Sequence, residues 1–294
     1  MLPVLAAAVL PVLTTVLVGF VWTRVGFRLD SKELTALIAD VATPCLIVST
    51  FLTTRVSFHA LAAVAGATAT AIVLFAALGA LFLWATRLRI RTFLPSLAFP
   101  NAGNLGLPLS LYAFGPEGLG YAIAFFSTSS VANYTLGQAI AAGRANWRGL
   151  VRQPILYAAA LGVMLSYGQV EAPAWLTATI SLIGDLTIPL MLLMLGSSLG
   201  QLKIASFGRA AVISVVRIVL GALVGIAVAA LFGLTGTMRA VLILQCANTV
   251  AVYNYLFAQR WNNEPEEVAG VVVLSTLLSL LSIPTLLIWL KASG

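Results

Sequence analysis

Long segments that are almost free of charged residues constrain this chain more than any other feature of its sequence. Each is about 20 residues long, which is the length that an α-helix needs to cross the hydrocarbon core of a bilayer. Only 9% of the 294 residues are charged, whereas soluble domains carry about a quarter. Because backbone groups inside a bilayer are satisfied only in helices or closed barrels, the sequence predicts an all-α integral membrane protein. The ten expected helices span 2–22, 33–54, 60–85, 93–114, 118–140, 153–168, 173–199, 208–233, 238–259 and 266–290.

The basic residues fall mostly on one side of these expected helices. If the N-terminus lies outside the membrane, twelve of the 16 lysines and arginines fall in inward loops and three in outward segments. Short cytoplasmic loops attract lysine and arginine, so we expect both termini to lie outside. No basic run or separate polar domain is available to hold a nucleic acid. The inward basic residues are Arg24, Arg28, Lys32, Arg87, Arg89, Arg91, Arg144, Arg148, Arg152, Lys203, Arg209 and Arg260, and the outward ones are Arg55, Arg239 and Lys291.

The fourth expected helix contains residues that ordinary spanning helices avoid. Pro100 lacks a backbone N–H and clashes with the preceding turn, and Gly103 allows the chain to unwind without a Cβ penalty. Asn101 and Asn104 place amides, which both donate and accept hydrogen bonds, inside the segment. A broken helix near the membrane midplane is the best sequence pointer to the binding site of a transporter. The expected helix-breaking residues are Pro100, Gly103, Gly106 and Pro108.

The two halves of the chain repeat each other. The segment 40–44, Asp-Val-Ala-Thr-Pro, recurs as Asp-Leu-Thr-Ile-Pro at 185–189, and the break at Asn101 has a counterpart at 245–254 in the ninth helix. The alternative is that so short a motif recurs by chance. Five helices in each half is an odd number, so the second half must enter the membrane from the opposite side, as in many secondary transporters. We expect an inverted repeat of residues 1–147 (helices 1–5) and 148–294 (helices 6–10).

The two broken helices supply the elements of an anion site. Each half-helix that follows a break presents unpaired N–H groups and about half a positive charge at its N-terminus, which suits a carboxylate. No lysine or arginine lies near either break in the sequence, so an anion would depend on these dipoles and on nearby amides. The alternative is that the asparagines only cap the broken helix ends. The expected substrate-binding amides are Asn101, Asn104, Asn248 and Gln245.

The fifth expected helix adds a polar stripe beside this site. Ser130, Asn133, Tyr134 and Gln138 fall near one face at helical spacing. Asn133 is therefore a candidate substrate contact. Polar stripes of this kind also mediate ordinary helix packing in membranes, and both interpretations stay open.

Asp40, Asp185 and Arg217 are the ionisable residues that lie deepest in the apolar segments. Charges inside a membrane are functional hypotheses by default. The aspartates would cap the kinks at Pro44 and Pro189 or pair with Arg217, which could instead reach the inner surface with its long side chain. We expect a structural role for all three, with proton coupling as the alternative.

The fourth-helix pattern resembles the auxin efflux carrier family, whose bacterial members include malonate-type and other organic-anion transporters. The resemblance covers the whole chain, and its specific part is Pro100-Asn101 followed by Asn-x-Gly-x-Pro-Leu at 104–109. Family members often have a proline at the ninth-helix break, where this chain has residues 246–248, Cys-Ala-Asn. In the family, the fifth helix contributes a polar residue to the substrate cavity one turn before a Tyr-Thr pair, and Ser129 matches that position.

The resemblance also implies an architecture and a mechanism. The fold would be shared with the bile acid/sodium symporters, with helices 4 and 9 crossing at their breaks in a mobile transport domain of helices 3–5 and 8–10. Helices 1, 2, 6 and 7 would form a scaffold and a homodimer interface, and movement would be elevator-like. The location would be a plasma membrane, which for a bacterial member is the inner membrane.

Three classes of function compete. The inverted repeat with broken helices favours a secondary carrier of small organic anions, such as auxin-like or dicarboxylic acids. A sodium-coupled symporter of the bile acid type is the alternative, although no aspartate or glutamate flanks either break. An intramembrane enzyme would need a base or metal ligands near a nucleophile, and the expected spans lack histidine. We therefore expect no enzymatic activity, no metal and no cofactor, with a small organic anion and the lipid bilayer as partners and proton or sodium coupling left open.

Overall fold

The computed structural model describes residues 2–27, 32–54, 57–143, 152–168, 172–202 and 205–292. Within these ranges all the regular elements are helices, joined by short non-helical segments, and there is no β-strand apart from one isolated backbone bridge. The expected all-α class is therefore confirmed. Several predictions concern residues outside the described ranges, namely Arg28, Arg55, Arg144, Arg148, Lys203, the side chain of Lys32 and the expected repeat boundary between residues 147 and 148.

Five helical stretches in the described part of the chain are long and apolar enough to cross a membrane. Three shorter apolar helices accompany them, Val9–Arg24, Pro154–Leu165 and Gly236–Cys246. These stretches support a multi-pass membrane protein, whereas the five-plus-five inverted repeat and the outside location of the termini stay predictions. The five long stretches are Glu33–Thr53, Phe58–Ala85, Ala174–Gln201, Phe207–Leu231 and Pro265–Ala292.

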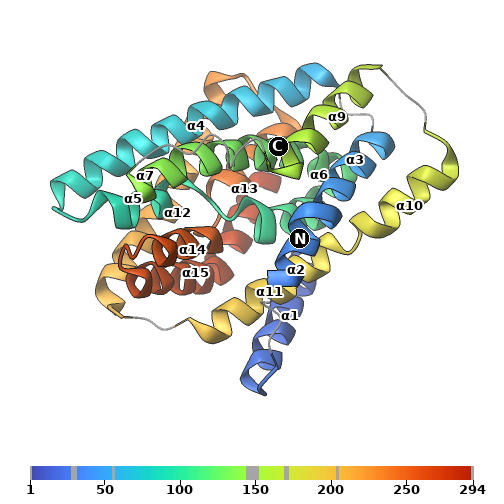
Figure 1. Cartoon of the computed structure of the whole chain (residues 1–294). Helices are drawn as coiled ribbons and strands as arrows, with labels where there is room; N and C mark the ends of the chain where they lie inside the picture. Colours follow the sequence, from blue (N-terminus) through green and yellow to red (C-terminus); the bar gives the residue numbers. More distant parts are fainter. Residues whose placement is uncertain are drawn as a thin grey trace.

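The helices gather into two groups, which lie on opposite sides of Figure 1. In the small group, α1 packs on α11, and α3 packs on both α9 and α10. The small group consists of α1 (Leu2–Arg24), α2 (Lys32–Ala36), the π-helix η1 (Leu37–Ala42), α3 (Thr43–Thr53), α9 (Pro154–Gly168), α10 (Ala174–Gly184) and α11 (Thr187–Gln201).

The large group contains the remaining helices. Here α12 packs on α15, α13 and α4, and α6 packs on α4 and α13. The large group consists of α4 (Phe58–Ala85), α5 (Ile90–Ala98), the π-helix η2 (Ala102–Gly106), α6 (Leu107–Ala132), the π-helix η3 (Asn133–Gly137), α7 (Gln138–Ala142), α12 (Phe207–Leu231), α13 (Gly236–Cys246), α14 (Val252–Arg260) and α15 (Pro265–Ala292).

Both copies of the Asp-x-x-x-Pro motif coincide with an irregular turn of helix. The first copy spans the change from η1 to α3, and the second spans the turn between α10 and α11. Pro44 and Pro189 have no N–H to give to the carbonyl four residues earlier, which belongs to Asp40 and Asp185 respectively, so a regular α-helix cannot continue through either motif.

A glycine separates the fourth expected helix from the fifth. Gly115 lies inside α6 with φ 69° and ψ −164°, a conformation that residues with a side chain rarely adopt. Pro116 follows it. The resulting kink turns the second half of α6 away from the first.

The tightest contact in the small group joins α1 to α11 through glycines. A Cβ at Gly196 would overlap the backbone carbonyl of Val16, and a Cβ at Gly19 would overlap that of Leu193. Beside them, Thr23 Oγ1 donates a hydrogen bond of 2.7 Å to Ser197 Oγ. Small residues at such contacts let two membrane helices approach closely, and the packing then holds them together.

Gly196→Ala should therefore destabilise the small group. The added methyl group forces α1 and α11 apart, and overpacking of this kind costs about 1–3 kcal/mol, or a fall in melting temperature of about 2–4 °C for each kcal/mol. Thermal unfolding followed by tryptophan fluorescence measures the change. Gly208→Ala is the matched control, because a Cβ there meets nothing within 4 Å; an equal effect of the two substitutions would contradict the close contact.

Candidate substrate-binding site

The two helix breaks lie directly against each other. Pro100 and Val250 form an antiparallel bridge, and the backbone N–H of Asn101 donates to the carbonyl of Thr249 at 2.8 Å. The side chain of Asn254 donates to the carbonyl of Phe99 at 3.2 Å. The unwound segments therefore satisfy one another's backbone groups, as non-helical chain at membrane depth requires.

Glycines allow this crossing to be compact. A Cβ at Gly106 would overlap the side-chain amide of Gln245, and a Cβ at Gly103 would lie 2.9 Å from the ring of Phe126. Gly103 and Gly106, two of the expected helix-breaking residues, therefore lie where a side chain would collide with Phe126 or Gln245. Pro108 lies where η2 passes into α6 and has no N–H to donate to the preceding turn of η2.

A cavity of about 410 Å³ lies where the crossing faces the small group. Both helix N-termini that follow the breaks reach it, through residues 102–104 of η2 and 251–253 at the start of α14. The first N–H groups of a helix have no partner within that helix. Both N-termini therefore present donors and positive partial charge to one space.

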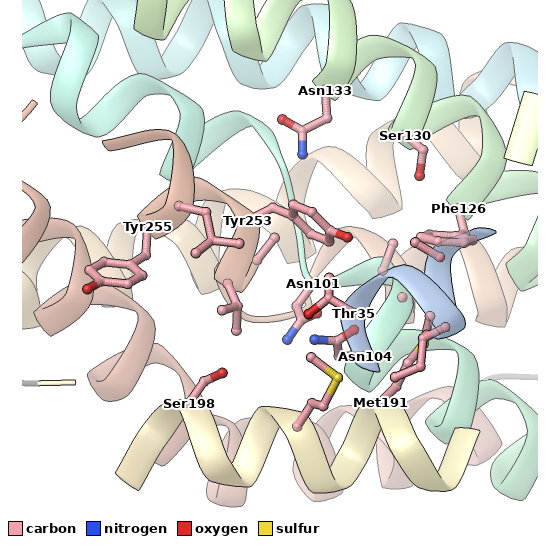
Figure 2. Close-up of a pocket in the computed structure, with 18 of the residues that line it drawn as sticks. Thr35, Asn101, Asn104, Phe126, Ser130, Asn133, Met191, Ser198, Tyr253 and Tyr255 are labelled. Atoms are coloured by element: carbon pink, nitrogen blue, oxygen red, sulfur yellow. The ribbon is translucent and has the colours of Figure 1, made fainter. Parts of the chain in front are cut away.

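Four of the expected contacts line this cavity: Asn101, Asn104, Ser129 and Asn133. Asn101 is only 3% exposed, and its Nδ2 has no hydrogen-bond partner among the described residues. Figure 2 shows Asn101 and Asn104 together at the centre of the cavity, with Asn133 pointing toward the same space from η3.

The other two expected contacts lie elsewhere. Gln245 and Asn248 are fully buried and do not line the cavity. Gln245 Nε2 lies 3.5 Å from Ser110 Oγ, and Asn248 Oδ1 accepts the N–H of Thr249 at 2.8 Å. The second break therefore contributes its helix N-terminus to the cavity, while these two amides pack inside the large group.

The expectation that no cation lies near the breaks is wrong. Arg217 of α12 is fully buried and donates to the carbonyl of Leu97 at 3.3 Å and to that of Cys246 at 2.7 Å. These carbonyls lie in the last turns of α5 and α13. The sequence places Arg217 far from either break, and only the folding of α12 across the crossing brings it there.

The expected pairing of Arg217 with the two aspartates is also wrong. Arg217 lies in the large group, whereas Asp40 and Asp185 lie in the small group, and both aspartates are exposed. The N-cap residues of α3 and α11 are Ala42 and Leu186 rather than the aspartates, and capping of the two kinks by Asp40 and Asp185 stays a prediction. The reach of Arg217 to the inner surface is excluded by its complete burial.

Sequence reasoning missed the wall that the small group and α14 contribute. Met191, Met194 and Ser198 of α11 line the cavity, as do Tyr253 and Tyr255 of α14. Figure 2 shows Met191 and Ser198 facing the asparagines across the cavity. No local motif marks the α11 residues, because their role depends on which helix packs opposite the crossing. The signal for Tyr253 was present, since it follows the second break directly.

Comparison with known proteins adds an independent finding. A family described as "Membrane transport protein" matches residues 4–146 and 140–287. The chain is 31% identical over 141 residues to auxin efflux carrier component 3a of Oryza sativa subsp. japonica, and 28% identical over 141 residues to auxin efflux carrier component 1 of Arabidopsis thaliana. Each match covers 46% of this chain and 23% of the relative. The chain thus spans about a quarter of the length of these curated relatives.

Cysteine labelling tests whether the cavity is open to water. In a chain with Cys45 and Cys246 replaced by alanine, we expect Ser130→Cys and Ser198→Cys to react readily with a hydrophilic thiol reagent, because both positions line the cavity and are partly exposed. Ser96→Cys is the matched control, since Ser96 is fully buried and does not line the cavity. Equal labelling of all three positions would contradict the cavity.

Proposed function

The chain belongs to the membrane transport protein family, which includes the auxin efflux carriers, and we propose that it is a secondary carrier of small organic anions. This membership groups it with transporters rather than with enzymes. We place it in a plasma membrane, in a bacterial cell the inner membrane, with both termini outside.

One observation carries the proposal. Two half-helix N-termini and Asn101, whose Nδ2 is buried without a hydrogen-bond partner among the described residues, line a single cavity. N–H groups and positive helix ends bind carboxylates without a fixed cation. A site of this kind holds an anion by hydrogen bonds and partial charges alone, and such an anion can also leave, as transport requires.

The charge of the site favours a monoanion. Two helix N-termini carry together about one positive charge, which matches one carboxylate. Among the described residues that line the cavity, none is charged. A second carboxylate would therefore be desolvated without a countercharge, which is costly.

The remaining wall favours an apolar or aromatic body on the substrate. Phe126, Met191, Met194, Tyr253 and Tyr255 line the cavity beside the polar groups. Its volume of about 410 Å³ falls in the ordinary range for small-molecule sites, about 300–1,000 Å³. Among the acids that the sequence left open, an auxin-like aromatic monocarboxylate fits better than a dicarboxylic acid.

The position of the cavity also supports elevator-type movement. It lies between the small group, which the α1–α11 contact holds together, and the large group, which contains the crossing. In this proposal, the large group carries the bound anion past a static small group. A homodimer that forms through the small group belongs to the same proposal, because it would hold that group still while the large group moves.

Asn101→Ala should weaken binding of the preferred carboxylate. A hydrogen bond to a charged group contributes about 1.5–3 kcal/mol, so we expect a loss of about 10- to 100-fold in affinity. Equilibrium binding and uptake by proteoliposomes, each with and without sodium and a pH gradient, provide the measurements. Asn263→Ala is the matched control, because Asn263 bonds the carbonyl of Ala141 and does not line the cavity. Normal uptake by folded Asn101→Ala would show that the Asn101 side chain does not bind the substrate.

The charge argument makes a separate prediction. An aromatic monocarboxylate should bind at least about tenfold more tightly than a dicarboxylate of similar size, because only one charge is matched. A thermal-shift panel of both classes at constant ionic strength tests this. Tighter binding of the dicarboxylates would refute the monoanion assignment while leaving the carrier proposal standing.

A further inference from the structure

Arg217 occupies an unusual position behind the crossing. Its guanidinium bridges the carbonyls of Leu97 and Cys246, which belong to the last turns of two different half-helices. The ring of Phe75 covers it, with the guanidinium carbon 4.6 Å from the ring centroid. No water-exposed surface remains on the side chain, which is 0% exposed.

One face of α12 is built to permit this contact. Gly221 and Gly225 follow Arg217 at intervals of four residues and therefore lie on the same face of the helix. A Cβ at Gly221 would overlap the carbonyl of Cys246, and a Cβ at Gly225 would lie 3.1 Å from the Cα of Ile243. The glycines let the end of α13 approach α12 closely enough for the guanidinium to reach its carbonyls.

The two helix ends that meet Arg217 are electrically negative. Each helix C-terminus carries about half a negative charge on its free carbonyls, so the pair carries about one. In secondary transporters with broken helices, carbonyls of this kind coordinate the sodium ion or proton that drives transport. Here a guanidinium, which is permanently charged and shaped to donate in two directions, supplies the positive charge instead.

We infer that Arg217 is a resident cation that takes the place of a coupling cation at the crossing. It neutralises the C-terminal ends of α5 and α13, so the N-terminal ends of η2 and α14 on the other side of the crossing are free to bind an anion without sodium or potassium. This inference rests on the proposed function for its meaning in transport, and it disfavours the sodium-symporter alternative.

Thermal unfolding of the purified full chain tests the inference without any substrate. Sodium, potassium and choline chloride at equal ionic strength should give the wild-type chain the same melting temperature. Arg217→Ala should melt lower, and millimolar guanidinium should raise its melting temperature by about 3 °C or more. Urea, which has nearly the same shape but no charge, should have no such effect at the same concentration.

Two further variants keep the outcome interpretable. Arg209→Ala removes an arginine from the same helix whose partner is Glu267 at 2.6 Å and whose side chain is 54% exposed; guanidinium should not stabilise this variant. Arg217→Lys keeps the charge, so its melting temperature should not respond to sodium, and it serves if Arg217→Ala does not fold.

Specific outcomes would overturn the inference. A wild-type chain that sodium stabilises relative to choline would have its cation site elsewhere. If urea raised the melting temperature of Arg217→Ala as much as guanidinium does, Arg217 would have only a space-filling role. The same would follow if no cation changed the melting temperature of Arg217→Ala. Failure of the proposed function would instead appear as absent carboxylate binding by the wild-type chain, which leaves these melting temperatures unaffected.

Discussion

The pairing of the two broken segments is the interaction on which the rest of the structure depends. A break in a membrane helix exposes carbonyl and N–H groups that lipid cannot satisfy. The chain solves this by placing one break against the other, so that Asn101 donates to Thr249 and Asn254 donates to Phe99. Once the segments cross in this way, four half-helix ends converge on one region, and their partial charges determine what each side of the crossing can hold.

The crossing places the negative C-terminal ends of two half-helices on one side and the positive N-terminal ends of two others on the opposite side. Its negative ends, at Leu97 and Cys246, meet the one guanidinium buried among the described residues. Its positive ends, at residues 102–104 and 251–253, meet the cavity. Burial of an arginine costs several kcal/mol unless it is well paired; these carbonyls accept from Nη1 and Nη2 of Arg217, while its Nε has no hydrogen-bond partner among the described residues. At the opposite ends, Nδ2 of Asn101 is buried without a hydrogen-bond partner among the described residues, and the proposed carboxylate would accept from it.

Local chemistry decided what the sequence could predict. Segment length and apolarity indicated membrane helices, and Pro100 with its flanking glycines located the first break within a residue or two of its place between α5 and η2. Asn101 and Asn104 could be assigned to the cavity because they lie at the break itself. Gln245 and Asn248 could not be placed, because rotation about the helix axis decides whether an amide faces the cavity or the core, and that rotation is set by packing.

Long-range packing decided the rest. The role of Arg217 depends on α12 lying across the ends of α5 and α13, with Gly221 and Gly225 on the same helical face at the contact with α13. The contribution of Met191 and Ser198 depends on α11 facing the crossing, which no motif in α11 records.

The most direct measurement is an experimental structure of the full chain with bound 4-iodobenzoate, in which iodine marks the orientation of the acid. The account predicts the carboxylate within hydrogen-bonding distance of Asn101 Nδ2 and of the N–H groups that begin η2 and α14; a carboxylate bound elsewhere, with these groups facing empty space, would contradict it.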